Sequence, residues 1–201
     1  MRNIEDYLFH KNNFLDSNFC KESVTVLEEG IWHKHHWDHY TGKSNTESSY
    51  PSGDKEPEVL LVDAGWSEQN KLKNSFMNKH IVEKLYEALY EYLWFAQENS
   101  LEGWVGYSAI KFIRYKNGQQ MKEHYDAIHS LFDGDRKGIP LLSIIGTLND
   151  NYEGGELVMF GEKKIEIKRG DLLIFPSTFL YPHKVNPVTE GARYSYVSWA
   201  W

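Results

Sequence analysis

His124-Tyr125-Asp126 is the stretch from which the rest of the chain is best interpreted. We expect residues 122–127 to form a β-strand. Because strand side chains alternate between two faces, His124 and Asp126 should project into one space while Tyr125 points away. One imidazole from a distant strand, that of His183, would complete a set of two histidines and one carboxylate. Such a facial set suits Fe(II) and leaves coordination positions open for a co-substrate and dioxygen.

The sequence from residue 107 onward has the pattern of a β-rich fold. Short apolar or alternating runs are separated by turn signals such as Asn117-Gly118, and residues 149–155 are expected to form a turn. The expected strands are residues 108–115, 122–127, 141–148, 156–160, 163–167, 170–175, 183–185 and 193–199. With no helical pattern between them, they predict a jelly-roll barrel, the double-stranded β-helix of cupin-like folds, backed by N-terminal helices.

The first hundred residues are expected to support this barrel. The predicted elements are a short strand over 13–15, a helix from 16 or 17 to about 29, a short strand over 59–62, and a long helix from 67 to about 99. Apolar residues of the long helix, Phe76 among them, should pack on the sheet. We also expect the flanking stripe of Tyr86, Tyr90 and Trp94 to be core.

A histidine-rich segment and a polar run lie between the two predicted helices. His33, His35, His36 and His39 are close together, but their spacing matches no compact metal motif, so we interpret them as a surface segment. Residues 41–57 are rich in Ser, Gly, Asn and Pro, and they predict a surface loop.

The composition is that of a single globular domain over residues 1–201. Within it, we expect residues 1–100 to form the helical support and lid region and residues 101–201 to form the jelly-roll core. Hydrophobic residues make up 41% of the chain and aromatic residues 15%. The formal net charge of −7 argues against a nucleic-acid partner.

The single cysteine, Cys20, excludes an internal disulfide and a cysteine-based zinc site. No signal-peptide pattern or membrane-length apolar stretch is present, so we expect a soluble cytoplasmic protein with no membrane contact.

Arg193 and Trp199 share one face of the last predicted strand, since they are an even number of residues apart. If that face points inward, one side chain lies deep in the barrel and the other near its opening. A deep arginine requires an anion, and its planar fork matches a carboxylate. Thr147 and Tyr115 could each donate a hydrogen bond to the same carboxylate.

Several motifs resemble the prolyl 4-hydroxylase-like branch of the 2-oxoglutarate- and Fe(II)-dependent dioxygenases. The resemblance is strong over 107–201 and weaker over 13–99. It is carried by Asn13-Phe14-Leu15 before a helix with Cys20, Tyr115-Lys116-Asn117-Gly118, His124-Tyr125-Asp126, residues 148–157 (LNDNYEGGEL), residues 170–177 (GDLLIFPS), His183-Lys184-Val185, Pro187-Val188 and Gly191-Ala192-Arg193.

The resemblance implies a role for each candidate residue. Iron would be held by His124, Asp126 and His183, the distal carboxylate of 2-oxoglutarate by Arg193 with help from Thr147 and Tyr115, and Trp199 would lie near the substrate side. Collagen-type members typically have lysine at the position of Arg193, whereas oxygen-sensing and many microbial members have arginine. The implied reaction consumes O2, decarboxylates 2-oxoglutarate to succinate and CO2, hydroxylates an unactivated C–H, and uses ascorbate as reductant.

Three functions are compatible with this resemblance. The first is a hydroxylase of a proline-containing peptide or protein, over which the polar segments 41–57 and 129–138 could close. The second is a hydroxylase of a free amino acid or other small molecule. The third is a catalytically silent barrel acting as a binding protein, which is disfavoured because every ligand position holds a competent residue. A nucleic-acid demethylase is also disfavoured, because such enzymes carry a second arginine where this chain has Trp199.

Overall fold

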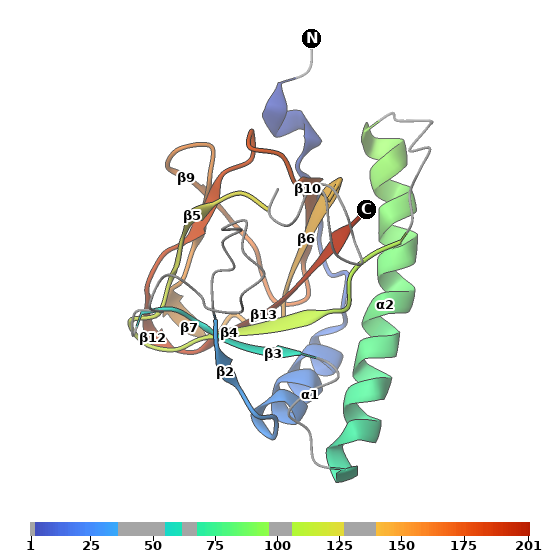
Figure 1. The fold of residues 1–201 in the computed structure, drawn as a ribbon, viewed down its shortest axis with the longest axis vertical. Helices are drawn as coiled ribbons and strands as arrows, with labels where there is room; N and C mark the ends of the chain where they lie inside the picture. The colour runs from blue at the N-terminus through green and yellow to red at the C-terminus, as the bar shows by residue number, and fades with distance from the viewer. Residues whose placement is uncertain (1–2, 36–54, 62–67, 97–105, 127–139) are drawn as a thin grey trace, which may run out of the picture.

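The computed structural model describes residues 3–35, 55–61, 68–96, 106–126 and 140–201, excepting the side chains of 61 and 68–73 (Figure 1). The helical elements are η1 (Ile4–Tyr7), α1 (Ser17–Glu28) and α2 (Glu68–Ala96). The strands are β1 (Phe9–Lys11), β2 (His33–Lys34), β3 (Glu58–Leu61), β4 (Lys111–Tyr115), β5 (Met121–His124), β6 (Leu142–Thr147), β7 (Tyr152–Gly154), β8 (Leu157–Met159), β9 (Lys163–Ile165), β10 (Leu172–Pro176), β11 (His183–Val185), β12 (Val188–Gly191) and β13 (Arg193–Ala200).

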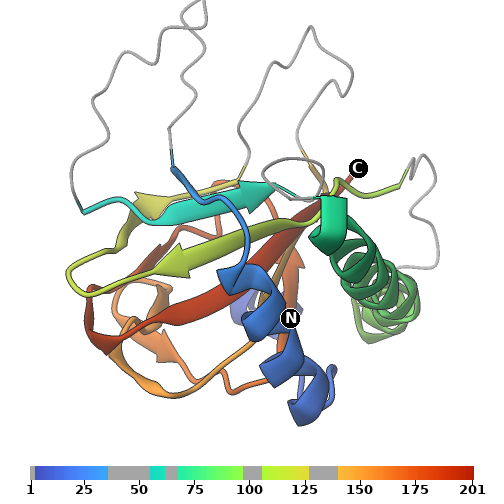
Figure 2. The ribbon, with the colours of Figure 1, turned by 90° about the horizontal axis from the view of Figure 1, so that it is seen from below.

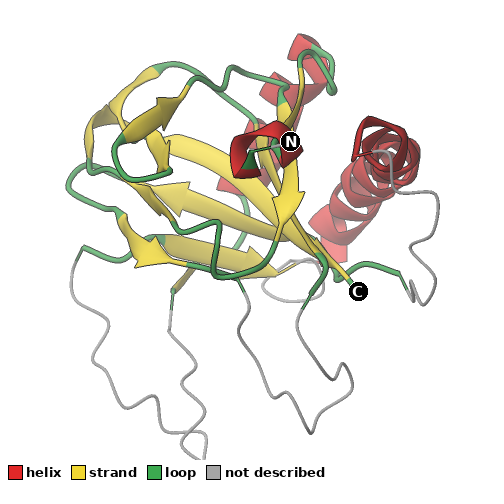
Figure 3. Ribbon diagram, turned by 90° about the horizontal axis from the view of Figure 1, so that it is seen from above, coloured by secondary structure: helices red, strands yellow, loops and turns green. Residues whose placement is uncertain are grey.

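The strands form two main sheets whose pairings among the described residues are all antiparallel. The larger sheet has the order β1-β10-β6-β13-β4-β3-β2, the smaller has the order β5-β11-β8-β9, and β7 pairs separately with β12. Figure 3 shows the strands gathered into one body with α2 beside it. A β-rich barrel with supporting helices is what the strand pattern predicts.

β6 shows how the larger sheet separates two environments. Leu142 and Ile144 join the apolar cluster beneath α1 and α2, whereas Ile145 joins a second cluster inside the barrel. Ser143 points to the interior side, where it contacts Asp126. Every residue of β6 is buried, so the prediction of a strand covered on both faces is confirmed.

α2 lies along the outer face of the larger sheet (Figures 1 and 2). The predicted aromatic stripe of Tyr86, Tyr90 and Trp94 is not core, and Trp94 is 79% exposed. Phe76 is also exposed, which contradicts its predicted packing. The reason is helical phase, because the face that meets the sheet passes through Met77, Ile81, Leu85, Ala88, Leu89, Tyr92 and Ala96.

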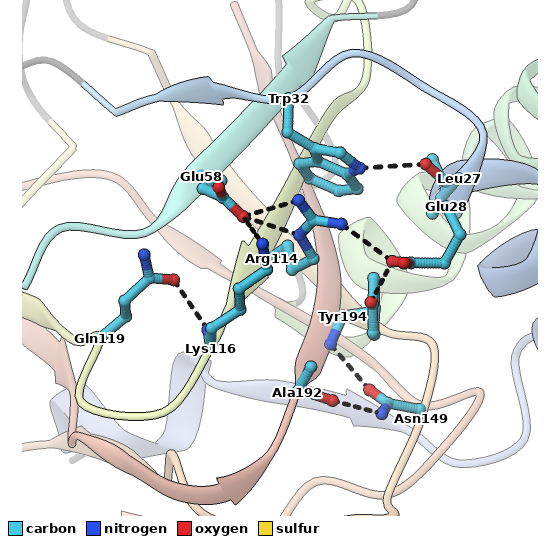
Figure 4. Close-up of polar contacts among 10 residues, drawn as sticks. All are labelled: Leu27, Glu28, Trp32, Glu58, Arg114, Lys116, Gln119, Asn149, Ala192 and Tyr194. Carbon is cyan, nitrogen blue, oxygen red and sulfur yellow. Dashed lines mark hydrogen bonds and ion pairs between the residues drawn. The ribbon is translucent and has the colours of Figure 1, made fainter.

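Arg114 fastens α1 and β3 to the outer face of β4 (Figure 4). Its guanidinium donates to Glu58 of β3 at 2.8 and 2.7 Å and to Glu28 of α1 at 3.0 Å. The Trp32 ring lies over the same group, with Arg114 Cζ 4.4 Å from the ring centroid. Tyr194 of β13 also donates to Glu28. Two carboxylates therefore match this buried arginine and offset the cost of burying its charge.

Two local predictions are wrong near chain turns. Residues 13–15 are a turn and bend rather than a strand, and Asn13 has a φ of 52°. The side chains of Phe14 and Leu15 are nevertheless buried in the apolar cluster, and the Leu15 N–H donates to the Gly170 carbonyl at 2.9 Å. Residues 149–155, predicted as a turn, contain β7, whose partner β12 was not predicted. Both strands are short and glycine-bounded, so they carry no alternating apolar signal.

The histidine-rich segment is described only at its start, up to His35, and the polar run after it only from residue 55. β2 pairs with β3, so His33 lies on an edge strand and is exposed. Glu56 and Pro57 are buried, which contradicts a surface loop reaching to residue 57. His36, His39, residues 41–54 and all of residues 129–138 lie outside the described residues. Among the helices that the structure describes, none has the length and apolar character to cross a membrane.

Gly170 occupies a backbone position that excludes other residues. Its φ is +84°, and a Cβ built there would lie 2.3 Å from the Leu15 carbonyl oxygen. We expect Gly170→Ala to lower the free energy of unfolding by more than about 3 kcal/mol, because the clash adds to a left-handed cost of about 1–2 kcal/mol. Urea unfolding measures this loss.

Gly161→Ala is the matched control for that variant. Gly161 has a similar φ of +86°, but a Cβ at this position would meet no other atom within 4 Å. Its free energy of unfolding should fall only by the cost of a left-handed backbone conformation for a residue with a Cβ, about 1–2 kcal/mol. Equal losses in the two variants would contradict the proposed clash with Leu15.

Arg114→Met should lower the free energy of unfolding by about 3 kcal/mol at pH 7, because two carboxylates lose their partner. Burial opposes ionisation of Glu58, but hydrogen bonds from Arg114 and Lys116 outweigh it and hold the Glu58 pKa below 4.5. That stabilisation is present above pH 4.5 and is lost as the pH falls through the lowered pKa. The difference in free energy of unfolding between the parent and the variant, measured by urea titration, should therefore be smaller at pH 3 than at pH 7.

Lys116→Met provides the comparison for Arg114→Met. Lys116 reaches the same Glu58 oxygen at 3.1 Å, but from an exposed position. Exposed ion pairs contribute less than about 1 kcal/mol, so its deficit should be small. A deficit as large as that of Arg114→Met, or an Arg114→Met deficit independent of pH, would count against this account.

Candidate metal centre

The pairing of β11 with β5 brings two distant histidines together. His183 lies directly opposite His124 in the antiparallel register, and their ring centroids are 4.3 Å apart. His183 is almost fully buried, and His124 is partly covered. A cross-strand pair on one face is the closest side-chain arrangement that a sheet provides.

Asp126 joins this pair from just beyond the strand. β5 ends at His124, so the predicted strand over 122–127 is too long, and Asp126 lies in the bend that follows. Its Oδ1 is 3.6 Å from His124 Nε2, and its Oδ2 is 3.9 Å from His183 Nε2. The three side chains offer ligand atoms that all lie within 4.8 Å of one another.

Backbone carbonyls select the tautomer of both histidines. His124 Nδ1 lies 2.8 Å from the Lys122 carbonyl oxygen, and His183 Nδ1 lies 3.1 Å from that of Tyr181. A carbonyl only accepts, so each Nδ1 carries the proton and donates it. Each Nε2 therefore keeps its lone pair on the side of Asp126, which is the arrangement of metal-binding histidines.

The charges of the site are also those of a metal centre. Burial, followed by the proximity of His183, lowers the pKa of His124 to about 4. Burial alone would raise the pKa of Asp126, but His183, His124 and hydrogen bonds from Ser143 and Trp199 outweigh it and lower that pKa. At neutral pH the site offers a neutral imidazole at His124 and an ionised carboxylate, the protonation states that bind a metal.

Two buried serines complete the surroundings of Asp126, and neither was expected there from the sequence. Ser143 Oγ donates to Asp126 Oδ2 at 2.6 Å and lies 2.7 Å from Ser177 Oγ. Period-two alternation places Ser143 on the same face of β6 as Thr147, which is the signal that could have found it. Ser177 follows β10, and no local pattern indicates its contact with another strand.

Arg193 forms the opposite end of the interior. It is 1% exposed, and its Nη1 donates to Ser195 Oγ at 3.2 Å. Among the described residues, its Nε and Nη2 have no hydrogen-bond partner, and neither has Thr147 Oγ1. The Arg193 Cζ lies 5.1 Å from the Tyr115 ring centroid. A buried cation with unused donors beside hydroxyl groups is an arrangement that suits an anion.

Tyr115 and Trp199 mark the two ends of this interior. Tyr115 pairs with Arg193 across β4 and β13, and burial raises the pKa of its phenol to about 12 against the opposing effect of Arg193. Trp199 pairs with Ser143, and its side chain hydrogen-bonds to Asp126. The last strand thus carries Arg193 at one end and Trp199 beside the three-residue cluster, as the shared-face prediction requires.

A family model described as the 2OG-Fe(II) oxygenase superfamily matches residues 110–201. A PKHD-type hydroxylase of Idiomarina loihiensis is 32% identical over 143 residues, which are 68% of this chain and 62% of that protein. A PKHD-type hydroxylase of Delftia acidovorans is 35% identical over 44% of this chain and 41% of its own length. The chain thus spans less than two thirds of these relatives.

Solved structures share the fold at low sequence identity. A viral collagen prolyl hydroxylase from Paramecium Bursaria Chlorella virus-1 has a TM-score of 0.63 at 17% identity, covering 96% of this chain and 94% of its own. A Trichoplax adhaerens prolyl hydroxylase, in complex with a hypoxia inducible factor peptide fragment, has a TM-score of 0.66 at 18% identity, covering 98% and 84%. The predicted double-stranded β-helix is confirmed by the fold that the chain shares with these two prolyl hydroxylases, and residues 110–201 of this chain belong to the 2OG-Fe(II) oxygenase superfamily.

Proposed function

We propose that this chain is a 2-oxoglutarate- and Fe(II)-dependent dioxygenase that hydroxylates prolyl residues in a peptide or protein. The observation that carries the proposal is the convergence of two imidazole Nε2 atoms and one carboxylate in a barrel that also buries an arginine with unused donors. In the proposed reaction, 2-oxoglutarate and O2 become succinate and CO2 as the substrate gains a hydroxyl group. We further propose that residues 101–201 are the catalytic core and that residues 1–100 support it.

The residues present fit an iron ion. His124, Asp126 and His183 supply two nitrogens and one oxygen, a donor set that suits Fe(II) and leaves positions for other ligands. Both Nδ1 atoms are engaged by carbonyls, so no rearrangement of tautomers is needed for binding. When bound, the iron would supply the activation of dioxygen and the cleavage of the C–H bond.

The interior also fits the co-substrate. Arg193 would bind the distal carboxylate of 2-oxoglutarate through the nitrogens that lack a protein partner, with Thr147 Oγ1 as a further donor. The Tyr115 phenol keeps its proton at neutral pH because its pKa is about 12, so it too can donate. The buried charge of Arg193 would then be compensated by the ligand rather than by the protein.

The comparisons support a peptide as substrate and proline as the residue modified. The curated relatives are PKHD-type hydroxylases, and one structural neighbour is a prolyl hydroxylase in complex with a peptide fragment. Trp199 lies beside Asp126, which agrees with a role on the substrate side of the centre. We propose ascorbate as the reductant that maintains the iron as Fe(II).

Turnover in vitro tests the proposed reaction. With Fe(II), 2-oxoglutarate and ascorbate, proline-rich peptides should stimulate succinate release, and the peptide product should gain one oxygen atom by mass spectrometry. His124→Ala should abolish the stimulation because the centre loses a ligand, whereas His33→Ala, which removes an exposed histidine of β2, should retain it. Stimulation by free proline alone would exclude the peptide substrate, and absence of both turnover and metal binding would exclude the dioxygenase.

Arg193→Met should weaken binding of 2-oxoglutarate by about 10–100-fold, since charge-assisted hydrogen bonds contribute roughly 1.5–3 kcal/mol. Calorimetry with Mn(II) in place of iron measures this without turnover. The unfolding free energy of the ligand-free protein should change by less than about 1 kcal/mol, because no described carboxylate loses a partner.

Arg114→Met is the matched control on the other face of the same sheet. It removes a buried arginine that two carboxylates match, so it should lose stability and keep its affinity for 2-oxoglutarate. If both variants lost stability equally, or if Arg193→Met bound 2-oxoglutarate like the parent, the assigned role of Arg193 would be wrong.

A further inference from the structure

Asp126 differs from the two histidines in how its position is defined. His124 and His183 lie on paired strands, and each ring is also held by a backbone carbonyl. Asp126 lies beyond the end of β5, where no described strand pairs with its backbone. Side-chain contacts must therefore place its carboxylate, and the closest of them comes from Ser143 at 2.6 Å.

The serine pair, Ser143 and Ser177, is held by backbone hydrogen bonding within the larger sheet. Ser143 lies within β6, where it pairs with Phe175 of β10 on one side and Trp199 of β13 on the other. Ser177 follows β10, and its N–H donates to the Leu141 carbonyl at 3.1 Å. Both serines are buried, with relative exposures of 0% and 1%, so water does not compete for their hydroxyl groups.

The direction of the hydrogen bonds follows from counting protons. Ser143 Oγ donates to Asp126 Oδ2, so the single hydroxyl proton of Ser143 is directed to that carboxylate oxygen. The contact of 2.7 Å between the two Oγ atoms must then be a bond in which Ser177 donates and Ser143 accepts. The chain runs from Ser177 to Ser143 to Asp126, and each bond polarises the next.

We infer that this serine relay holds the Asp126 carboxylate in its ligand position and that Ser143 is a positioning residue of the metal centre. The inference rests on the proposed function, because it takes the three-residue cluster to be a metal site. By occupying Oδ2, Ser143 opposes rotation of the carboxylate and leaves Oδ1 facing His124 Nε2. Groups that orient a metal ligand in this way contribute about 10–100-fold to metal affinity.

Binding of Co(II) alone, without 2-oxoglutarate or turnover, tests the relay. Titrations followed by visible absorption and calorimetry should show that Ser143→Ala binds Co(II) about 10–100-fold more weakly than the parent, with a shifted absorption band. Ser177→Ala should have a smaller effect, because Ser143 can still donate to Asp126. The double variant should match Ser143→Ala, because Ser177 acts only through Ser143.

Ser198→Ala is the control for loss of a buried hydroxyl. Ser198 lies on the opposite face of β13, where its Oγ donates to the Ser108 carbonyl at 2.9 Å, away from the cluster. It should lose thermal stability yet bind Co(II) within about twofold of the parent, since it contacts no proposed ligand.

Four outcomes would overturn the relay. Ser143→Ala binding Co(II) like the parent would remove the positioning role. Losses that multiply in the double variant would show that the serines act independently. Equal weakening in Ser143→Ala and Ser198→Ala would assign the effect to general stability. Failure of the parent itself to bind Co(II) would instead refute the proposed metal site, and the relay with it.

Discussion

The register between β5 and β11 is the constraint on which the site depends. It sets His183 opposite His124, and β11 is itself held on its other side by β8. Because side chains alternate along a strand, a slip of one residue would turn one imidazole away from the other. The pairing of strands in the smaller sheet therefore fixes where the two imidazole Nε2 atoms lie relative to each other.

Two arginines on neighbouring strands of the larger sheet show how its faces differ. Arg114 pairs with Tyr194 in the register of β4 and β13, and Arg193 pairs with Tyr115 in the same register. On the helix side, Arg114 forms ion pairs with the carboxylates of Glu28 and Glu58, so its charge stabilises the fold. On the interior side, Arg193 is even more deeply buried but is not matched by any described carboxylate. A buried arginine charge that no described carboxylate matches marks the place in the interior where an anionic ligand is expected.

Sequence patterns predict those features that one segment encodes by itself. The period of two indicated that His124 and Asp126 share a side and that Arg193 and Trp199 share a face, and the structure has both arrangements, although Asp126 lies beyond the strand. The serine pair was not predicted, because it depends on which strands become neighbours. The prediction of which face of α2 is buried was also wrong, since apolar residues such as Phe76 and Trp94 occur around much of the helix circumference. Helical periodicity then identifies the helix more reliably than the face that is buried.

The three members of the cluster thus differ in how strongly the fold defines them. Each imidazole is restrained twice, by strand pairing and by a carbonyl that fixes its tautomer. The carboxylate is restrained by hydroxyl and indole groups that reach it from β6 and β13. Removal of one such side chain changes no backbone pairing, whereas moving either histidine requires a change in the sheet. The Asp126 carboxylate is therefore the member of the cluster that single substitutions can adjust while leaving the barrel intact.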